Sequence, residues 1–307
     1  MTVLVTGAGG FVGGHLCAAL SRSGAEVVAI GRQGGKAAGR ARHFVGTDTI
    51  PDVAMLGKVM DRFRPEQVFH LAGAASAPSV AELYAVNTLY AVDLLEAAGR
   101  VTRPPRIVIL GSAAEYGAPM KPGRLMSEAD PERPGSSYGI AKLAQTHHAL
   151  AASGLPVVVA RLFNPIGAGM PEGTAAGRFV RQIAELRGRD GVIHTAGPLD
   201  AVRDVVDISD AVDALIQLGC DRIPSGRVYN LCTGHGTAMA DVTATLARLA
   251  PGSVEFRAGD GNAGIPWAVG NPARLAEHGV TLRLPDLEDV LGEMLAVVGA
   301  SRVQELQ

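Results

Sequence analysis

Short, almost uninterrupted hydrophobic runs alternate with longer stretches of helical periodicity through the first half of the chain. Continuous apolar runs are typical of strands covered on both faces in a parallel sheet. The runs expected as strands are 2–7, 26–31, 67–73, 106–112 and 156–163, and the stretches expected as helices are 12–23, 53–63, 80–99 and 138–153. This alternation predicts an α/β fold with a doubly wound parallel sheet of the Rossmann type.

The rhythm changes after about residue 165, where the sequence NPIGAGMPEGTAAG forms a long loop rich in glycine and proline. Such a loop is typical of a binding or lid segment. Beyond it we expect helices at 176–187 and 208–218 and strands at 191–195 and 227–234. We predict a dinucleotide-binding domain over 1–165, with a return segment at about 202–235, and a smaller interleaved C-terminal substrate-binding lobe over 166–201 and 236–307.

Composition narrows the class of protein. With 307 residues, 47% hydrophobic and 19% charged, the chain can bury a large core. A formal charge of −2 gives no reason to expect nucleic acid as a partner. Three scattered cysteines suggest buried thiols in a reducing compartment and show no metal-ligand spacing. Because Met1 runs directly into the first strand, and no apolar run has transmembrane length, we expect a cytoplasmic protein with no membrane partner.

A glycine-rich turn, VTGAGGFVGGHL, joins the first expected strand to the first expected helix. Its glycines are spaced so that backbone N–H groups can approach a diphosphate, with the helix N-terminus facing that negative charge. Among 39 glycines such a triplet can arise by chance, but the strand–turn–helix context is the one a dinucleotide site requires. The expected cofactor contacts are Gly7, Gly10, Phe11, Val12 and Gly13, and a merely structural turn is the alternative.

Basic residues, rather than an acidic one, follow the second expected strand. A carboxylate there would bind an adenosine 2′-hydroxyl and repel a 2′-phosphate. The residues present are Gly31, Arg32, Lys36, Arg40 and Arg42. They favour NADP(H), with Arg32 as a contact, over NAD(H), which stays possible because a solvated basic loop would look the same. Asp48 or Asp52 could reach the adenine amino group or could cap the next helix.

A serine, a tyrosine and a lysine form a candidate proton-transfer set. Ser112 ends the fourth expected strand, and the carboxyl ends of such strands face the ligand. Tyr138 and Lys142, in SSYGIAKLAQ, share one face of a helix. The ammonium is expected to lower the tyrosine pKa from its ordinary value of about 10, while the serine holds the substrate oxygen. Helix packing alone is the alternative.

The motifs and their order resemble the extended short-chain dehydrogenases/reductases that modify nucleotide sugars. The matching segments are TGAGGFVG, FHLAG at 69–73, VNT at 86–88, GSAAEYG at 111–117, YGIAK at 138–142, RLFNPIG at 161–167 and LDAVRDVVDISDAVDAL at 199–215. The resemblance covers the chain to about residue 235. It implies that Tyr138 is the acid/base, Lys142 orients the nicotinamide ribose and Ser112 binds the reacting oxygen. From FHLAG, the expected cofactor contacts are Leu71, Ala72 and Gly73.

Three neighbours of Ser112 bear on the type of reaction. Family members that carry out 4,6-dehydration place an acidic pair where this chain has Ala113 and Ala114, so dehydration is not expected. Epimerases often carry threonine at the second of these positions, which weakens epimerisation but leaves it open. Glu115 completes GSAAEYG, which looks like the GDP-4-keto-6-deoxy-D-mannose reductases. The resemblance therefore implies NAD(P)H-dependent reduction of the 4-keto group of a nucleotide-linked 4-keto-6-deoxy sugar, with Tyr138 as proton donor.

Substrate contacts follow from the resemblance and from charge. The expected set is Ser112, Ala113, Glu115, Asn164, Arg178 and Arg203, and no metal is expected. Arg203 could bind the nucleotide diphosphate in a fork or form a surface ion pair. Asn164 could face the sugar or cap a loop, and Glu115 could face the sugar or be a structural carboxylate.

The remaining polar and aromatic candidates carry mostly structural expectations. Asn87 is equally open as a site amide or a structural one, and His70 is expected in the core. The segment 257–275 departs from the family pattern, which leaves the nucleotide and the sugar open. Trp267, inside it, could stack on a base but is more often packing in such a context.

Two further readings concern function and assembly. A nucleotide-sugar 4-epimerase is the alternative enzyme, and a non-catalytic dinucleotide-sensing regulator is the alternative of another class. Segments 80–98 and 138–153 carry apolar residues on more than one helical face. In this family such helices pair across a two-fold axis, which implies a homodimer, although packing within one chain would give the same pattern.

Overall fold

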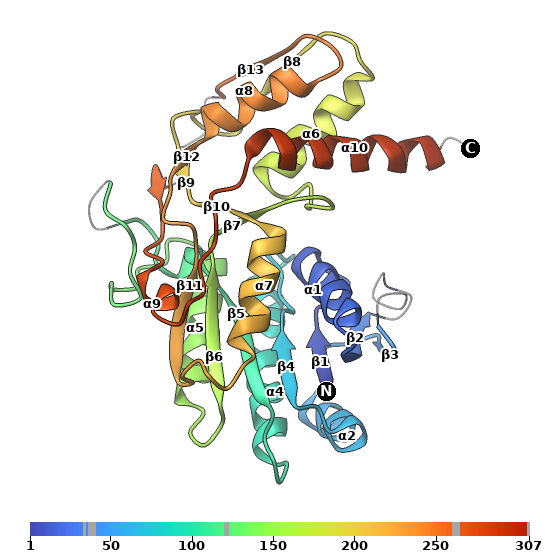
Figure 1. Ribbon diagram of the computed structural model, residues 1–307, viewed down its shortest axis with the longest axis vertical. Helices are drawn as coiled ribbons and strands as arrows, with labels where there is room; N and C mark the ends of the chain where they lie inside the picture. The colour runs from blue at the N-terminus through green and yellow to red at the C-terminus, as the bar shows by residue number, and fades with distance from the viewer. Residues whose placement is uncertain (33–34, 36–40, 120–122, 260–264, 306–307) are drawn as a thin grey trace.

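A seven-stranded parallel sheet forms the centre of the computed structural model, which describes residues 1–32, 35, 41–119, 123–259 and 265–305 (Figure 1). Its strands are β1 (Thr2–Thr6), β2 (Glu26–Arg32), β3 (His43–Thr47), β4 (Gln67–His70), β5 (Arg106–Ser112), β6 (Val157–Leu162) and β11 (Arg227–Leu231). Their order is β11-β6-β5-β4-β1-β2-β3, and every neighbouring pair is parallel. The chain reverses its direction of winding between β1 and β4, so ligands are expected at the carboxyl ends of these strands. The predicted doubly wound α/β fold is confirmed.

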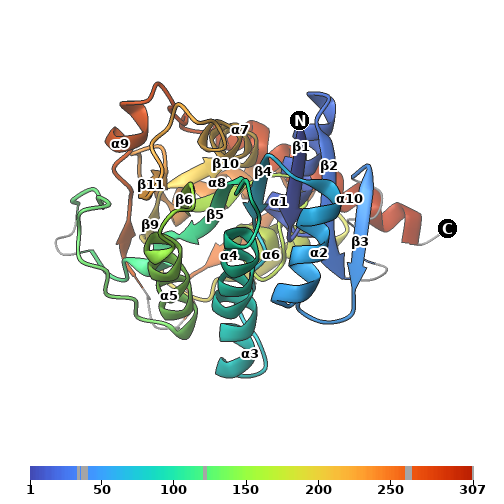
Figure 2. The ribbon, with the colours of Figure 1, turned by 90° about the horizontal axis from the view of Figure 1, so that it is seen from below.

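Helices cover both faces of the sheet (Figure 2). They are α1 (Phe11–Arg22) and α7 (Ile208–Leu218) on one face, and α2 (Val53–Phe63), α4 (Tyr90–Gly99) and α5 (Ser137–Ala151) on the other. Successive strand residues point to opposite faces, so Val3 and Val5 join the core under α1 and α7 while Leu4 joins the core under α2 and α4. Both sides of β1 are therefore buried, as its continuous apolar sequence indicates.

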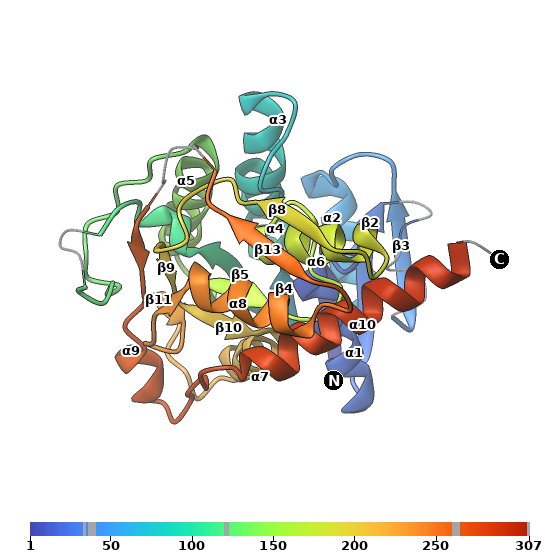
Figure 3. The same cartoon turned by 90° about the horizontal axis from the view of Figure 1, so that it is seen from above.

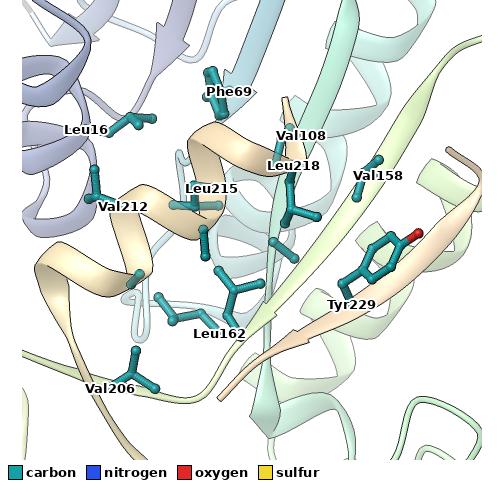
Figure 4. Close-up of a cluster of buried hydrophobic side chains, with 14 of the residues drawn as sticks. Leu16, Phe69, Val108, Val158, Leu162, Val206, Val212, Leu215, Leu218 and Tyr229 are labelled. Carbon is teal, nitrogen blue, oxygen red and sulfur yellow. The ribbon is translucent and has the colours of Figure 1, made fainter. Parts of the chain in front are cut away.

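The core on the α7 side reaches from the first helix to the last strand of the sheet. Figure 4 shows Val212, Leu215 and Leu218 of α7 directed at side chains of the sheet strands. All of them are buried, together with Leu16 of α1 and Tyr229 of β11. This packing fixes α7, which belongs to the late return segment of the chain, on the sheet built by the first half.

Two local features differ from the sequence expectations. Strand β3 was not expected, because its sequence HFVGT is half-buried at the sheet edge and has no continuous apolar pattern. The stretch expected as one helix over 80–99 is divided into α3 (Val80–Tyr84), a π-helical turn η2 (Ala85–Leu89) and α4. Asn87 explains the break, because its side-chain amide donates to the Leu83 carbonyl at 3.0 Å, the acceptor that an α-helix would use for a backbone N–H.

A smaller lobe stands over the carboxyl edge of the sheet (Figures 1 and 3). Its elements are α6 (Ala175–Leu186), β8 (Gly191–His194), α8 (Met239–Leu249), β13 (Val254–Arg257) and α10 (Leu287–Glu305). Residues of these elements, among them Phe179, Leu246 and Leu291, share a separate hydrophobic core. The lobe is thus assembled from segments on both sides of the α7–β11 return.

Short strands connect the lobe to the sheet. They are β7 (Asn164–Ile166) with β10 (Val205–Asp207), and β9 (Val202–Arg203) with β12 (Thr237–Ala238) and β14 (Trp267–Ala268). The remaining described helices are the 3₁₀ turn η3 (Ala113–Glu115) and α9 (Ala273–Ala276). Cys17 and Cys232 are buried thiols, as expected, and Cys220 is half-buried.

The described residues contain neither a candidate membrane-spanning helix nor a candidate metal cluster. None of the helices seen in the described ranges is both long and apolar enough to cross a membrane. Likewise, within residues 1–32, 35, 41–119, 123–259 and 265–305, no three His, Cys, Asp or Glu side chains come together as a metal site.

Candidate active site

The glycine turn after β1 is packed so closely that side chains cannot fit. Gly7 has a φ of 70°, and a Cβ there would lie 2.6 Å from the backbone nitrogen of Ala72. A Cβ on Gly13 would lie 2.2 Å from the Gly7 carbonyl oxygen. Gly10 is the N-cap of α1 and makes no side-chain cap, so the first N–H groups of this 12-residue helix can bind an anion. The turn therefore fits the diphosphate of a dinucleotide.

The segment after β4 lies against this turn. The Leu71 N–H donates to the Thr6 carbonyl at 3.2 Å. The side chains around Gly73 leave no space there, because a Cβ would lie 2.9 Å from Asn87 Oδ1 and 3.9 Å from Lys142 Nζ. The structure thus brings together the two segments expected at the cofactor and connects the second of them to Lys142.

The expected adenosine end lies at the edge of the sheet. The β2–β3 register pairs Arg32 with Thr47, so Arg32 and Asp48 lie at neighbouring strand ends, and both are exposed. Asp52 takes the capping alternative, since its carboxylate accepts the Met55 N–H of α2 at 2.8 Å. Lys36 and Arg40, which also suggested a 2′-phosphate, lie outside the described residues.

Ser112 and Tyr138 meet at the carboxyl end of β5. Ser112 is the N-cap of η3, and its Oγ accepts the Ala114 N–H at 3.2 Å. Tyr138 is the second residue of α5, which Ser136 caps by accepting the Gly139 N–H at 3.1 Å. The Ser112 side chain lies near enough to the Tyr138 phenol to lower its pKa. The two side chains that the sequence places in one site therefore lie near each other.

The expected lowering of the Tyr138 pKa is wrong for this structure. Burial raises the pKa of Tyr138; the Ser112 hydrogen bond lowers it by less, and the nearby Glu115 raises it further. The Lys142 ammonium, which was expected to act on the phenol, instead donates to the Leu110 carbonyl. As a result the phenol retains its proton, which suits a proton donor.

Lys142 lies wholly within the protein, one helical turn after Tyr138. Burial lowers the pKa of Lys142 to about 8, and the Glu115 carboxylate counteracts part of that shift. The ammonium lies beside Gly73 in the segment expected to bind the cofactor. Its position is compatible with a contact to the nicotinamide ribose.

Glu115 takes the structural alternative rather than facing a sugar. It is fully buried, and its Oε1 accepts the Ser112 N–H at 2.7 Å. Its Oε2 accepts Thr146 Oγ1–H at 2.8 Å and Arg161 Nε–H at 2.7 Å. Arg161 is also fully buried, and its Nη2 donates to Glu132 at 2.8 Å. A buried ion pair therefore lies directly beneath the serine.

Asn87 and His70 both have structural roles. The Asn87 side chain accepts the Ala74 N–H at 3.1 Å and donates to the Ala74 carbonyl at 2.9 Å, so it fixes the segment after β4. His70 is buried as expected, with Nδ1 at 2.9 Å from Thr6 Oγ1. Burial, and secondarily the charge of Lys142, lowers the pKa of His70 to about 3.

Arg203 and Asn164 lie where the small strands connect the lobe to the sheet. The Arg203 guanidinium donates to the Val202 carbonyl at 2.8 Å, and burial lowers its pKa. The neighbouring Asp204 does not depend on it as an ion-pair partner, because both its oxygens accept hydrogen bonds from Thr233, Gly234 and Gly270. Asn164 donates to the Asp204 carbonyl at 2.9 Å, which matches the loop-capping alternative.

Two further candidates lie in the lobe. Arg178 is exposed on α6. Trp267 pairs with Val202 in the register, while Arg203 pairs with Ala268, so Trp267 and Arg203 occupy opposite faces of this small sheet. A Cβ on Gly236 would lie 3.3 Å from the Trp267 ring. The packing alternative for Trp267 is therefore favoured over stacking on a base held by Arg203.

Sequence reasoning missed Arg161, Thr146 and the four hydrogen bonds of Asp204. Arg161 leaves a signal, since an arginine inside the apolar run PVVVARLF must be paired if that run is a buried strand. Asp204 leaves a weaker one, because only the fold brings residues 233, 234 and 270 to it. Thr146 leaves none.

A family model and several known proteins are similar in sequence to this chain. The model of the NAD dependent epimerase/dehydratase family matches residues 3–232. The dTDP-6-deoxy-L-talose 4-dehydrogenase (NAD(P)(+)) of Kitasatospora kifunensis is 34% identical, over 76% of this chain and 74% of its own. The GDP-6-deoxy-D-mannose reductase of Pseudomonas aeruginosa is 28% identical, over 62% and 66%. The UDP-glucose 4-epimerase of Azospirillum brasilense is 30% identical, over 86% and 82%.

Two solved structures are similar to this chain over nearly its whole length. MoeE5 in complex with UDP-glucose and NAD has a TM-score of 0.83 at 28% identity, covering 98% of this chain and 100% of its own. RMD from Pseudomonas aeruginosa complexed with NADPH has a TM-score of 0.80 at 25% identity, covering 98% of each chain. The similarity to these structures includes the smaller lobe, which lies mostly beyond the family match.

Proposed function

The chain belongs to the NAD dependent epimerase/dehydratase family, and from that premise we propose that it reduces the 4-keto group of a nucleotide-linked 4-keto-6-deoxy sugar. At the coarser level it is an NAD(P)-dependent enzyme of a family that modifies nucleotide sugars. The observation that carries the finer proposal is the partly buried Tyr138, whose pKa is raised and whose phenol lies near Ser112, together with Ala113 and Ala114 directly after that serine.

The residues of this chain divide the work of a ketone reduction. Ser112 holds the sugar O4 oxygen by a hydrogen bond, and Tyr138 donates its proton to that oxygen as negative charge develops on it. Lys142, whose ammonium lies beside Gly73, orients the nicotinamide ribose. Ala113 and Ala114 supply no acid or base, so the elimination of water that 4,6-dehydration requires has no catalyst at these positions. When bound, the reduced nicotinamide supplies the hydride to C4.

NADPH is the proposed form of the cofactor. Arg32 is exposed at the end of β2, where a carboxylate would be expected for NADH. Both forms of the cofactor occur among similar proteins. The 34% identical dehydrogenase is an NAD(P)(+) enzyme, and RMD was solved in complex with NADPH. Arg203 is proposed to bind the substrate diphosphate and the smaller lobe to hold the nucleotide, with Asn164 and Arg178 as further contacts.

The test is cofactor oxidation by the purified protein. NADPH and NADH are followed by absorbance in parallel, with GDP- and dTDP-linked 4-keto-6-deoxy sugars as substrates. We expect oxidation of NADPH, and we expect Tyr138→Phe to reduce kcat by about a hundredfold or more while still binding the cofactor. If the wild-type protein oxidises neither cofactor with any of these sugars, the proposal is refuted. If the protein were instead a non-catalytic dinucleotide-sensing regulator, Tyr138→Phe would leave its function unchanged.

A 4-epimerase is the second candidate, and the 30% identity to a UDP-glucose 4-epimerase over 86% of the chain favours it. The same tyrosine would then remove and return a proton in one catalytic cycle. Incubation with UDP-glucose separates the two functions, because an epimerase forms a 4-epimer without net consumption of cofactor.

We also propose that the enzyme is a homodimer. Val80, Leu89, Ile140 and Leu150 leave 58%, 55%, 45% and 40% of their surface exposed. They belong to α3, η2 and α5, and Figure 2 shows α3, α4 and α5 on one side of the molecule. A second copy of the same surface would cover them across a two-fold axis. Sedimentation of the wild type and of Leu89→Lys tests this, since the variant should be monomeric.

A further inference from the structure

Glu115 is a buried charged group that has no part in the proposed reduction. It is fully buried, and its two oxygens accept three hydrogen bonds, from Ser112, Thr146 and Arg161. Burying a carboxylate is costly unless its partners are well placed. Each of its partners belongs to an element that carries or supports part of the Ser112, Tyr138 and Lys142 set.

The Oε1 atom fixes the serine. It accepts the Ser112 backbone N–H at 2.7 Å and completes a capping box, in which Ser112 Oγ in turn accepts the Ala114 N–H. Gly111 is required for this contact, because a Cβ there would lie 2.7 Å from the same Oε1 atom. One carboxylate oxygen therefore fixes the backbone at Ser112.

The Oε2 atom fixes the helix. Thr146 lies one turn after Lys142 on α5 and donates to Oε2 at 2.8 Å. Arg161 of β6 donates to the same oxygen at 2.7 Å, and its guanidinium lies 4.5 Å above the Tyr116 ring. The strand end that carries Ser112 and the helix that carries Tyr138 and Lys142 are thus connected through a single side chain.

The same carboxylate is the charge that opposes the desolvation of Lys142. The titratable groups that interact with Lys142 are Glu115 from η3 and His70 from β4, and Tyr138 lies one turn before it on its own helix. His70 is neutral at working pH because its pKa is lowered to about 3. Of these three groups, Glu115 alone can therefore supply negative charge to Lys142 at neutral pH.

We infer that Glu115 is a positioning residue of this active site: it holds Ser112 and α5 in register and keeps Lys142 cationic. The inference rests on the proposed reductase function for its kinetic consequence. Its electrostatic part concerns Lys142 directly and is independent of which reaction the enzyme catalyses.

The main test is Glu115→Gln with two readouts. The first is the pH profile of kcat/KM for reduction. Removing the negative charge lowers the pKa of both Lys142 and Tyr138, so the basic limb should move to lower pH by about one unit. The second is NMR titration of isotope-labelled lysine. The chain has four lysines, Lys36, Lys58, Lys121 and Lys142, and comparison with Lys142→Met identifies the signal of interest.

Glu132→Gln is the matched control. Glu132 accepts a hydrogen bond from the same Arg161 at 2.8 Å, but its side chain is 29% exposed, and within the described part of the chain it has no hydrogen bond to Ser112 or Thr146. Because water screens it, its removal should shift the Lys142 titration less than that of Glu115. A purely structural role for the whole ion-pair cluster would make the two variants alike.

The Lys142 pKa and the pH profile of Glu115→Gln together support or overturn the inference. A lower Lys142 pKa in Glu115→Gln, together with a shifted basic limb, supports the inference, and a folded variant with unchanged values overturns it. If the wild type reduces no keto sugar but the Lys142 shift is seen, the proposed function falls while the Glu115 assignment stands. If Glu115→Gln does not fold, Glu115→Asp keeps the charge but is shorter. It should then leave the Lys142 pKa in place and lower kcat about tenfold, and a wild-type kcat would overturn the inference.

Discussion

Replacing Asp204 by asparagine is expected to destabilise the protein strongly although the shape of the side chain is kept. Asp204 is fully buried and accepts four hydrogen bonds: from the Thr233 N–H at 2.8 Å, the Thr233 hydroxyl at 2.8 Å, the Gly234 N–H at 3.0 Å and the Gly270 N–H at 3.2 Å. These bonds connect β9–β10 to the end of β11 and to the segment before α9. Asparagine keeps one acceptor oxygen and turns an NH₂ group toward the other pair.

The magnitude follows from the two glycine N–H groups. With the amide oxygen on Thr233, the N–H groups of Gly234 and Gly270 face a donor and lose their partners. Each unsatisfied buried donor costs about 1–3 kcal/mol. Burial raises the pKa of Asp204, so the carboxylate itself is desolvated at a cost that the neutral amide avoids. A net loss of about 2–4 kcal/mol in the free energy of unfolding is therefore expected.

Thermal unfolding measures this loss against a matched control. For a chain of this size 1 kcal/mol corresponds to roughly 2 °C in Tm, so Asp204→Asn should lower Tm by roughly 4–8 °C. Asp207→Asn makes the same chemical change three residues later, at the N-cap of α7, where Asp207 accepts the Ser209 N–H at 2.7 Å. Asparagine is nearly as good a cap, so Tm should hardly change. Equal Tm values for the two variants would refute the reasoning.

Three further predictions concern the cofactor turn, the lysine and the buried histidine. Gly13→Ala, whose Cβ would lie 2.2 Å from the Gly7 oxygen, should raise the cofactor Kd at least about tenfold in a fluorescence titration, while Gly57→Ala, with open space around its Cβ, should leave Kd unchanged. The kcat/KM for reduction should fall as pH rises through about 8, because Lys142 must keep its charge; a profile flat to pH 10 would contradict this. As pH falls from 6.5 toward about 3, the unfolded chain protonates His70 and the folded protein does not. Stability should therefore drop by up to about 1.4 kcal/mol per pH unit, and acid unfolding of His70→Gln should lack that part of the slope.

The sheet was predictable because burial on both faces leaves a mark in the sequence. Strands such as β5 and β6 are apolar at nearly every position, and the helices between them have clear periodicity. Strand β3 lacked that mark because it lies half-buried at the edge. The π-helical turn was not predictable, since it depends on an Asn87 side chain that reaches both the Leu83 and Ala74 carbonyls.

The placement of the candidate site residues was predictable where motif and topology coincide. Ser112, Tyr138 and the glycine turn follow from their places at strand ends and helix starts. The roles of Glu115 and Arg161 were not, because their pairing depends on a register between β5 and β6 that sequence alone does not specify. The Tyr138 pKa was expected in the wrong direction for a related reason: the depth of burial is a property of the folded molecule.

The buried pair of Glu115 and Arg161 restricts how this sequence can be recombined with those of its relatives. The two residues are 46 positions apart, and η3, α5 and most of β6 lie between or beside them. A chimera whose crossover falls between residues 116 and 160 takes the two partners from different parents. Where the second parent lacks the complementary charge, the hybrid carries an unpaired ion in its core. Segment 111–161 is therefore best exchanged as one block, and a library built with that boundary should yield more folded enzymes than one cut inside it.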